Sequence, residues 1–163
     1  MKLLLSLGLV LVLISSSFAA DSDFQVQVKI VGGIGLLKVD DLVYDDVTAT
    51  AAVQPIKVDP DTADPNGTPA QFTVTGTPAA VVDCTITGAL VQLDNGGGAN
   101  IPIGDWRMGD GTDAGVACTG GAKYSPTLAG GAADVFIGAT ITVGAWQTNG
   151  DYTGDQTLTV IYQ

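Results

Sequence analysis

The chain has 163 residues, including 17 acidic residues that are all Asp, and its formal net charge at neutral pH is −11. Only six residues are Lys or Arg and none is His. This excludes a basic surface for nucleic acid or anionic lipid. It also excludes the imidazole needed by serine and cysteine hydrolases and by most zinc sites. We therefore expect neither an enzyme nor a cofactor-dependent protein.

Residues 1–19 have the pattern of a secretory signal peptide. Lys2 provides a basic start, residues 3–14 form an apolar run, and Ser17-Phe18-Ala19 is a small-x-small cleavage site. The apolar run is too short for a comfortable membrane span, which takes about 20 residues. We expect a secreted mature chain that begins at Ala20, has no membrane span, and lies in an extracellular fibre or at the cell surface.

Residues 20–33 form an N-terminal extension with strict alternation. Its apolar positions are Phe24, Val26, Val28 and Ile30, and Gln25, Gln27 and Lys29 separate them. Gly32-Gly33 follows as a flexible joint. An edge strand this regular either pairs within its own sheet or is available to another chain. We consider both, and the extension is a candidate donor strand.

Residues 34–163 are typical of an all-β domain. Short runs with strand-like alternation recur between Gly, Pro and Asn-Gly turn signals, which predicts an immunoglobulin-like antiparallel β-sandwich. The clearest runs are 70–76, 81–93, 134–143 and 157–163, and weaker ones are 36–39, 41–47, 53–58 and 115–120. We expect loops over 58–69 and 96–115.

The 58–69 segment is a weak candidate for a metal site. Asp59, Asp61, Asp64 and Asn66 offer oxygen ligands of the kind that Ca²⁺ takes. Their spacing does not match an EF-hand, and a plain acidic turn is the favoured interpretation. Asn66-Gly67-Thr68 also matches an N-glycosylation sequon, whose use depends on the host.

Two pairs of residues have both a functional and a structural interpretation. Cys84 and Cys118 are the only cysteines. In an exported chain they predict a disulfide, which would close about 35 residues and stabilise the fold by roughly 3–4 kcal/mol. The alternative is two buried thiols.

Trp106 and Trp146 offer a sugar-stacking platform, but packing is the commoner role of tryptophan.

The stretch VFIGATITVGAWQTNGDYTGDQTLTVIYQ, residues 135–163, resembles the C-terminal signature of a family of secreted bacterial domains whose function is unassigned. The signature runs approximately V-G-x-T-L-x-V, Q-x-x-G-x-Y-x-G and V-x-V-x-Y. The matching positions are Gly138, Thr140, Val143, Gln147, Gly150, Tyr152, Gly154, Val160 and Tyr162. Upstream, DLVYDDV and PAQFTVTG resemble two further motifs of that family.

That family is similar to spore-coat-U-like proteins and to chaperone–usher pilins, and the pilins share the positions of Gly150 and Tyr162. The resemblance implies an immunoglobulin-like sandwich, which in some members lacks a strand, completed by an N-terminal strand from a neighbour. Its groove would lie beside a C-terminal strand that carries Leu158, Val160 and Tyr162. No active site is implied.

We therefore expect a structural subunit of a fibre or pilus that assembles by donor-strand complementation. Its partners would be further copies of itself, together with a periplasmic chaperone and an outer-membrane assembly protein. One alternative is a monomeric calcium- or carbohydrate-binding sandwich. Another is a coat or matrix protein that associates without strand exchange.

Overall fold

The computed structural model describes residues 32–88, 91–118 and 122–163. The chain divides into two units, Met1–Ile30 and Val31–Gln163, and the described residues belong to the second. The predicted signal peptide and donor residues 24–31 therefore lie outside the described part. The described strands are β1 (Gly35–Asp40), β2 (Val43–Tyr44), β3 (Gln54–Val58), β4 (Gly67–Thr68), β5 (Ala70–Thr75), β6 (Val82–Thr87), β7 (Gln92–Asp94), β8 (Asn100–Gly109), β9 (Val116–Ala117), β10 (Ala132–Val143) and β11 (Thr157–Tyr162).

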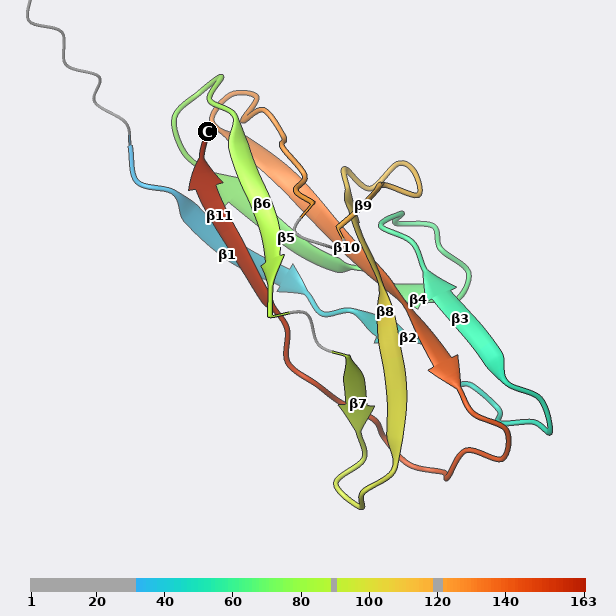
Figure 1. Ribbon diagram of the computed structural model, residues 1–163. Coiled ribbons are helices and arrows are strands. Elements are labelled where there is room, and N and C mark those ends of the chain that lie inside the picture. The colour runs from blue at the N-terminus through green and yellow to red at the C-terminus, as the bar shows by residue number, and fades with distance from the viewer. Residues whose placement is uncertain (1–31, 89–90, 119–121) are drawn as a thin grey trace, which may run out of the picture. The chain divides into compact units, whose positions relative to one another are not determined.

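The larger sheet has seven strands in the order β1-β5-β10-β8-β7, with β3 also beside β10 and β9 beside β8 (Figure 1). β10 is its central strand. Residues 132–137 of β10 pair with β5, residues 139–143 pair with β3, and β8 pairs along the other edge. Every one of these ladders is antiparallel.

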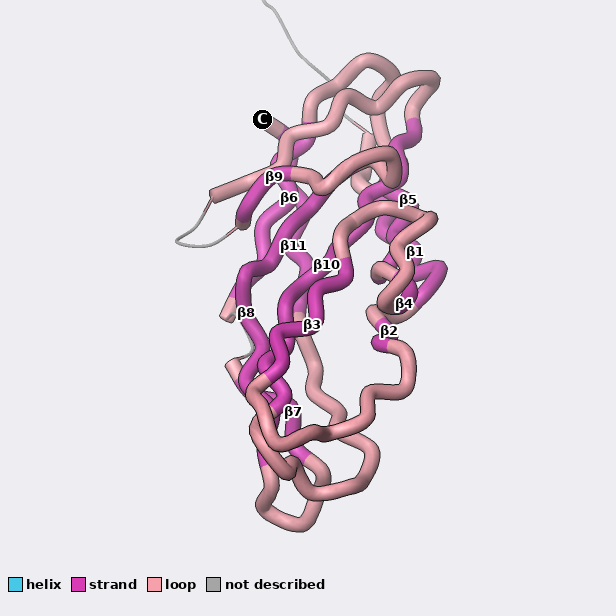
Figure 2. Tube along the Cα trace, turned by 90° about the vertical axis from the view of Figure 1, so that its right-hand side faces the viewer, coloured by secondary structure: helices cyan, strands magenta, loops and turns pink. Residues whose placement is uncertain are grey.

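β6 and β11 form a second, two-stranded antiparallel sheet. In β11, Leu158, Val160 and Tyr162 are half-buried against the core, while the residues between them are exposed. This is the period-2 alternation of a strand with one buried face. The prediction of an all-β antiparallel sandwich is confirmed. Figure 2 shows only strands and loops in the described residues. The described part of the chain contains no helix long and apolar enough to cross a membrane.

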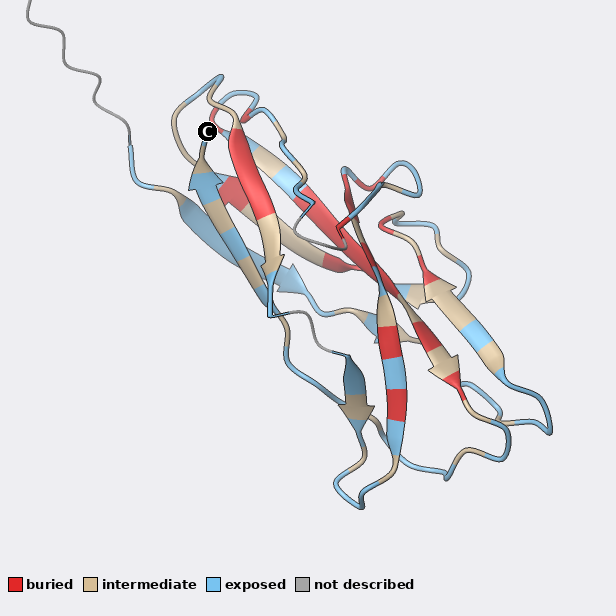
Figure 3. Cartoon of the chain, in the orientation of Figure 1, coloured by how far each residue is buried: buried red, intermediate tan, exposed pale blue. Residues whose placement is uncertain are grey.

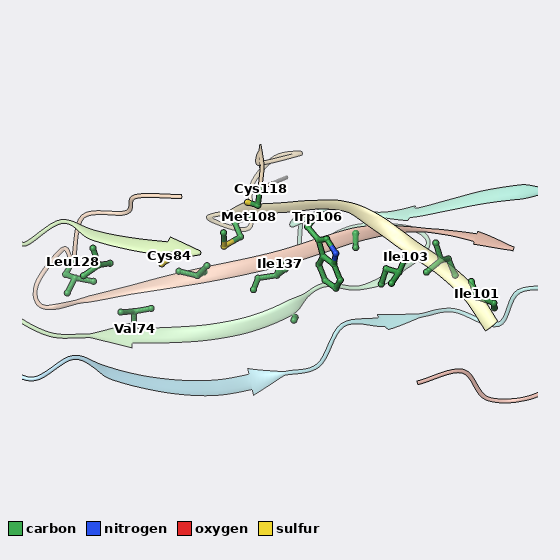
Figure 4. Packing of buried hydrophobic residues seen from close by; sticks show 14 of the residues in the cluster. Val74, Cys84, Ile101, Ile103, Trp106, Met108, Cys118, Leu128 and Ile137 are labelled. Carbon is green, nitrogen blue, oxygen red and sulfur yellow. The ribbon is translucent and has the colours of Figure 1, made fainter. Parts of the chain in front are cut away.

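The core lies between the two sheets and contains mostly aliphatic side chains. Val74, Val82, Met108, Leu128 and Val135 are completely buried. Figure 3 shows buried residues on β6, β8 and β10, and Figure 4 shows Val74, Met108 and Leu128 within the core. At roughly 1.5–3 kcal/mol for each buried side chain of this size, these residues supply much of the driving force for folding.

One carboxylate is buried near the core. Asp83 of β6 accepts a hydrogen bond from Ser125 Oγ at 2.6 Å and forms an ion pair with Lys123. These two partners hold the pKa of Asp83 below its usual range. The free energy of unfolding that Lys123 and Ser125 contribute through Asp83 is therefore fully present at a pH above the pKa of Asp in the unfolded chain. It is lost as the pH falls through the lowered pKa of Asp83 in the folded chain.

The expected 96–115 loop is wrong in its central part, because β8 occupies residues 100–109. In the first half of β8 the odd-numbered residues Ile101 and Ile103 are buried. In the second half the even-numbered residues Trp106 and Met108 are buried instead. A β-bulge causes this change. Gly104 pairs with Thr140 and Arg107 with Gly138, so β8 contains one extra residue, and Asp105 within the bulge has φ 48°. The bulge interrupts the alternation by which a strand is recognised in a sequence.

Candidate functional site

A groove of about 830 Å³ opens between the large sheet and the ends of the second layer. One wall is the segment 41–49, which follows β1, and the other is the segment 147–158, which leads into β11. Lys38 of β1 and Thr157 and Leu158 of β11 also line the groove, so one end of each strand reaches it. The volume falls within the range of about 300–1,000 Å³ that is typical of binding sites in proteins.

The floor of the groove is aliphatic and aromatic. Its residues come mainly from β8 and β10, and Figure 4 shows Ile101, Ile103 and Trp106 in a row along β8. The buried floor residues are Ala70, Ile101, Ile103, Trp106, Ile137, Ile141 and Val143. The sequence interpretation missed the three from β8, because it assigned them to a loop. The Ile-x-Ile alternation before Gly104 was the available signal for a strand there.

Tyr44 fixes the first wall to the sheet. Its hydroxyl donates a hydrogen bond of 2.8 Å to the carbonyl oxygen of Ala139 in β10, and its backbone pairs with Gly67 of β4. Burial raises the pKa of Tyr44, and the charge of Asp64 adds to this effect. The hydroxyl therefore stays protonated and keeps its donor role across the physiological range.

Tyr152 and Gln147, both positions of the C-terminal signature, shape the second wall. The Tyr152 hydroxyl donates to the Thr148 carbonyl oxygen at 2.6 Å and accepts from Gln147 Nε2 at 2.9 Å. Gln147 Nε2 also lies 3.2 Å from the Asn100 carbonyl oxygen at the start of β8. Gly150 lies in the turn between them with φ 151°, a conformation that favours glycine. These contacts hold the wall beside the floor.

The apolar surface of the groove is incompletely covered. Leu42, Tyr44, Phe72, Tyr152 and Leu158 line it and are only partly buried. All six residues of β1 are exposed. Within the described residues, β1 pairs only with β5 and β11 only with β6, so each strand has an outer edge without a ladder partner. Apolar surface combined with unpaired edges is a ready template for another strand.

The rim of the groove is acidic. Asp41, Asp45 and Asp46 lie on the first wall, and Asp151 and Asp155 lie on the second. Among the described residues that line the groove, the only cation is Lys38, whose Nζ lies 2.7 Å from an Asp41 carboxylate oxygen. Five carboxylates against one ammonium group leave four negative charges without a cation among the lining residues.

The acidic 58–69 segment forms turns around its own carboxylates. Asp61 accepts from the Ala63 N–H at 2.9 Å. Asp64 accepts from the N–H groups of Asp59 and Asn66, both at 2.8 Å. Such bonds are typical of Asx turns. In the described part of the chain, acidic and cysteine side chains form no cluster of three or more suited to a metal ion.

The two tryptophans do not form a shared platform. Trp106 is 5% exposed and belongs to the floor of the groove, while Trp146 is 76% exposed in the loop after β10. Trp146 has φ 55°, which is unusual for a bulky residue. Its N–H donates to the Thr50 carbonyl oxygen at 2.8 Å. A sugar-binding surface built from both rings is therefore absent from this structure.

Cys84 and Cys118 are both buried and are present as two free thiols. Burial raises the pKa of Cys84 to about 11, and the nearby charges of Asp83 and Cys118 add to this effect. Burial also raises the pKa of Cys118. Because the thiolate is the form that oxidises, these thiols react slowly once the chain is folded. The predicted disulfide stays a prediction.

Intact-mass measurement of the exported protein tests both the leader and the disulfide. We expect the loss of residues 1–19 or 1–20 and a further deficit of two hydrogens. Alkylation should be carried out in denaturant without reductant, because the folded chain shields both sulfurs. Two alkylated cysteines under those conditions would show that the bridge is absent.

Comparison with curated proteins gives no match. Comparison with protein families gives one, described as "Domain of unknown function (DUF4402)", over residues 42–162. The match spans both walls and the floor of the groove, together with the C-terminal signature. It agrees with the expected resemblance to a family of unassigned function. The chain therefore belongs to the DUF4402 domain family.

Proposed function

We propose that the protein is a structural subunit of an extracellular fibre, in which residues 24–31 of one copy occupy the groove of the next. The observation that carries this proposal is the groove itself. It has an apolar floor, and the two strands that reach it, β1 and β11, each have an edge without a ladder partner among the described residues. A donated strand could complete the second layer by hydrogen bonding to these edges.

The N-terminal extension has the properties that such a groove requires. Its four alternate apolar residues, Phe24, Val26, Val28 and Ile30, would contact the floor, while Gln25, Gln27 and Lys29 would face outward. Burying four such side chains contributes roughly 6–12 kcal/mol before the entropy of association is subtracted. This supports stable association without covalent links.

The resemblance to chaperone–usher pilins adds support, through the positions of Gly150 and Tyr162, and spore-coat-U-like proteins are similar to the same family. Because donor and groove are different surfaces of one chain, the contact is head-to-tail and propagates into a filament unless a ring closes. A subunit with an uncovered groove would be prone to aggregation. We therefore also propose that a periplasmic chaperone covers the groove until an outer-membrane assembly protein joins the subunits.

Electron microscopy and sedimentation of the purified mature protein test the proposal. We expect filaments or ladders of oligomers, and we expect a synthetic peptide of residues 20–31 to shorten them by competing for the groove. A scrambled peptide of the same composition is the control. A mature protein that remains a stable monomer under all assembly conditions would rule out strand donation between subunits.

A further inference from the structure

The sequence contains three Asn-Gly pairs, Asn66-Gly67, Asn95-Gly96 and Asn149-Gly150. In such a pair the backbone nitrogen of Gly can lose its proton and attack the side-chain carbonyl carbon of Asn, because glycine has no Cβ atom to block the approach. Asn is accordingly among the thermolabile residues of proteins. The attack requires an Asn side chain that is free to rotate, so the fold decides which of the three pairs reacts.

Hydrogen bonds hold the Asn66 side chain and the peptide groups around it. Asn66 Nδ2 donates to the Lys57 carbonyl oxygen in β3 at 2.8 Å. The Asn66 carbonyl oxygen accepts from the Asp45 N–H at 2.9 Å, and the following residue, Gly67, pairs with Tyr44. Bringing the side-chain carbon of Asn66 to the Gly67 nitrogen would break these contacts, so the first pair is protected.

Asn95 is held by the turn that it begins. Its Oδ1 accepts from the N–H groups of Gly97 at 2.9 Å and of Ala99 at 3.1 Å. The Gly96 N–H, which belongs to the attacking nitrogen, donates to the Asp94 carboxylate. Rotation of the Asn95 side chain toward Gly96 would break both hydrogen bonds to Oδ1, so the second pair is also protected.

The Asn149 side chain has no such restraint. Asn149 lies in the long loop that joins β10 to β11, on the second wall of the groove (Figure 1). It is exposed, as are Gly150 and Asp151. Among the described residues, none makes a hydrogen bond to the Asn149 side chain. The third pair therefore combines the reactive sequence with an exposed and unrestrained side chain.

We propose that Asn149 is a modification site, at which the folded protein slowly forms isoaspartate and aspartate while Asn66 and Asn95 are protected. The Gly150 nitrogen forms a bond to Asn149 Cγ as the bond from Cγ to Nδ2 breaks. Nδ2 leaves as ammonia with the proton of the Gly150 nitrogen. Water then opens the succinimide ring at either carbonyl, and neither step changes an oxidation state. Opening at the main-chain carbonyl gives isoaspartate, in which the main chain runs through the former side chain.

Isoaspartate at position 149 lengthens the main chain of the wall by a methylene group and adds a carboxylate beside Asp151. The added length falls between Thr148 and Tyr152, whose hydrogen bond of 2.6 Å closes the turn. Just beyond this turn, Thr153 and Asp94 exchange backbone hydrogen bonds of 3.0 and 2.9 Å. We expect the modification to loosen the wall as far as this bridge. The reaction depends only on the loop around Asn149, so it is independent of what the groove binds.

Peptide mapping by mass spectrometry tests the selectivity. The folded protein, incubated at mildly alkaline pH in water enriched in heavy oxygen, takes up the label wherever a succinimide ring opens. We expect the label at position 149 to appear at least about fivefold faster than at positions 66 and 95, which is the factor for breaking one ordinary hydrogen bond. The control is the same protein in denaturant, where the three pairs should react at similar rates. Equal rates in the folded protein, or an unlabelled Asn149, would overturn the assignment.

Amide hydrogen exchange at Thr153 tests the effect on the wall, because exchange reports local opening. The isoaspartate form, separated from the incubated sample by ion exchange, should exchange the Thr153 N–H several-fold faster than the unmodified protein. Asn149→Asp is the matched control, since it adds the same charge without lengthening the main chain, and its rate should stay close to the original. An unchanged rate in the isoaspartate form, or an equal increase in Asn149→Asp, would show that the longer main chain does not loosen the wall.

Discussion

A Val28→Asp substitution is expected to abolish filament assembly while leaving a folded, soluble subunit. Val28 lies in the middle of the four apolar donor residues, so the new carboxylate would have to enter the apolar groove of the next copy. The floor consists of residues such as Ile103 and Ile141, which offer no hydrogen-bond donor. Burying a charge there costs several kcal/mol, a large part of the roughly 6–12 kcal/mol that the donor contributes before entropy. Electron microscopy and the melting temperature of the variant provide the two measurements.

Gln27→Asp is the matched control for this prediction. It introduces the same charge one residue earlier, on the outward face of the donor, and should leave assembly largely intact. The alternative, in which residues 24–31 pair with their own sheet, predicts a different pair of results. The unmodified protein would then be monomeric, and Val28→Asp would lower its melting temperature sharply instead of changing its state of association.

Replacing Gly138 with Ala is expected to destabilise the sandwich by about 3 kcal/mol, at the upper end of the usual range for overpacking. Gly138 lies in β10, just before the residues that pair with β3. A Cβ atom at this position would lie 2.1 Å from the Val58 carbonyl oxygen and 2.8 Å from the Asp59 carbonyl carbon. These are backbone atoms, so β3 or β10 must move. Thermal unfolding should show a melting temperature lower by roughly 10 °C.

Gly104→Ala is the control for Gly138→Ala. Gly104 also lies in a central strand, β8, and pairs with Thr140 of β10. A Cβ atom there would meet no atom within 4 Å, and the backbone does not have a positive φ. We expect a melting temperature close to that of the unmodified protein. Equal losses in the two variants would mean that β-propensity, and not the close approach of Val58, explains the effect.

Three strands of the sandwich could be predicted from the sequence. The expected runs at 70–76, 134–143 and 157–163 correspond to β5, β10 and β11. β5 and β10 are apolar runs bounded by turn signals, and residues 135–139 of β10 are buried without interruption. In β11 every second side chain faces the core, so the pattern in the sequence and the pattern of burial coincide. The same alternation, read in residues 24–31, led to the proposed donor strand.

Strands whose limits depend on distant contacts could not be predicted in the same way. The expected run 81–93 contains two separate strands, β6 and β7, which belong to different sheets. β4 consists of Gly67 and Thr68, inside an expected loop, and exists because Tyr44 and Val43 pair with it. The groove combines both kinds of segment. Its wall beside β11 follows from the alternation, whereas its floor depends on the bulged strand β8.

The position of β1 has a mechanical consequence for a filament of the proposed kind. Tension along the filament would reach each sandwich at the residues before β1, and its component along β1 would load that strand lengthwise. β1 is held by five residue pairs with β5, from Gly35↔Thr75 to Asp40↔Gln71. The hydrogen bonds of an antiparallel ladder are perpendicular to the strands, so this force would shear them together instead of peeling them apart one by one. The load would then pass through β5 into β10 and spread across the whole sheet.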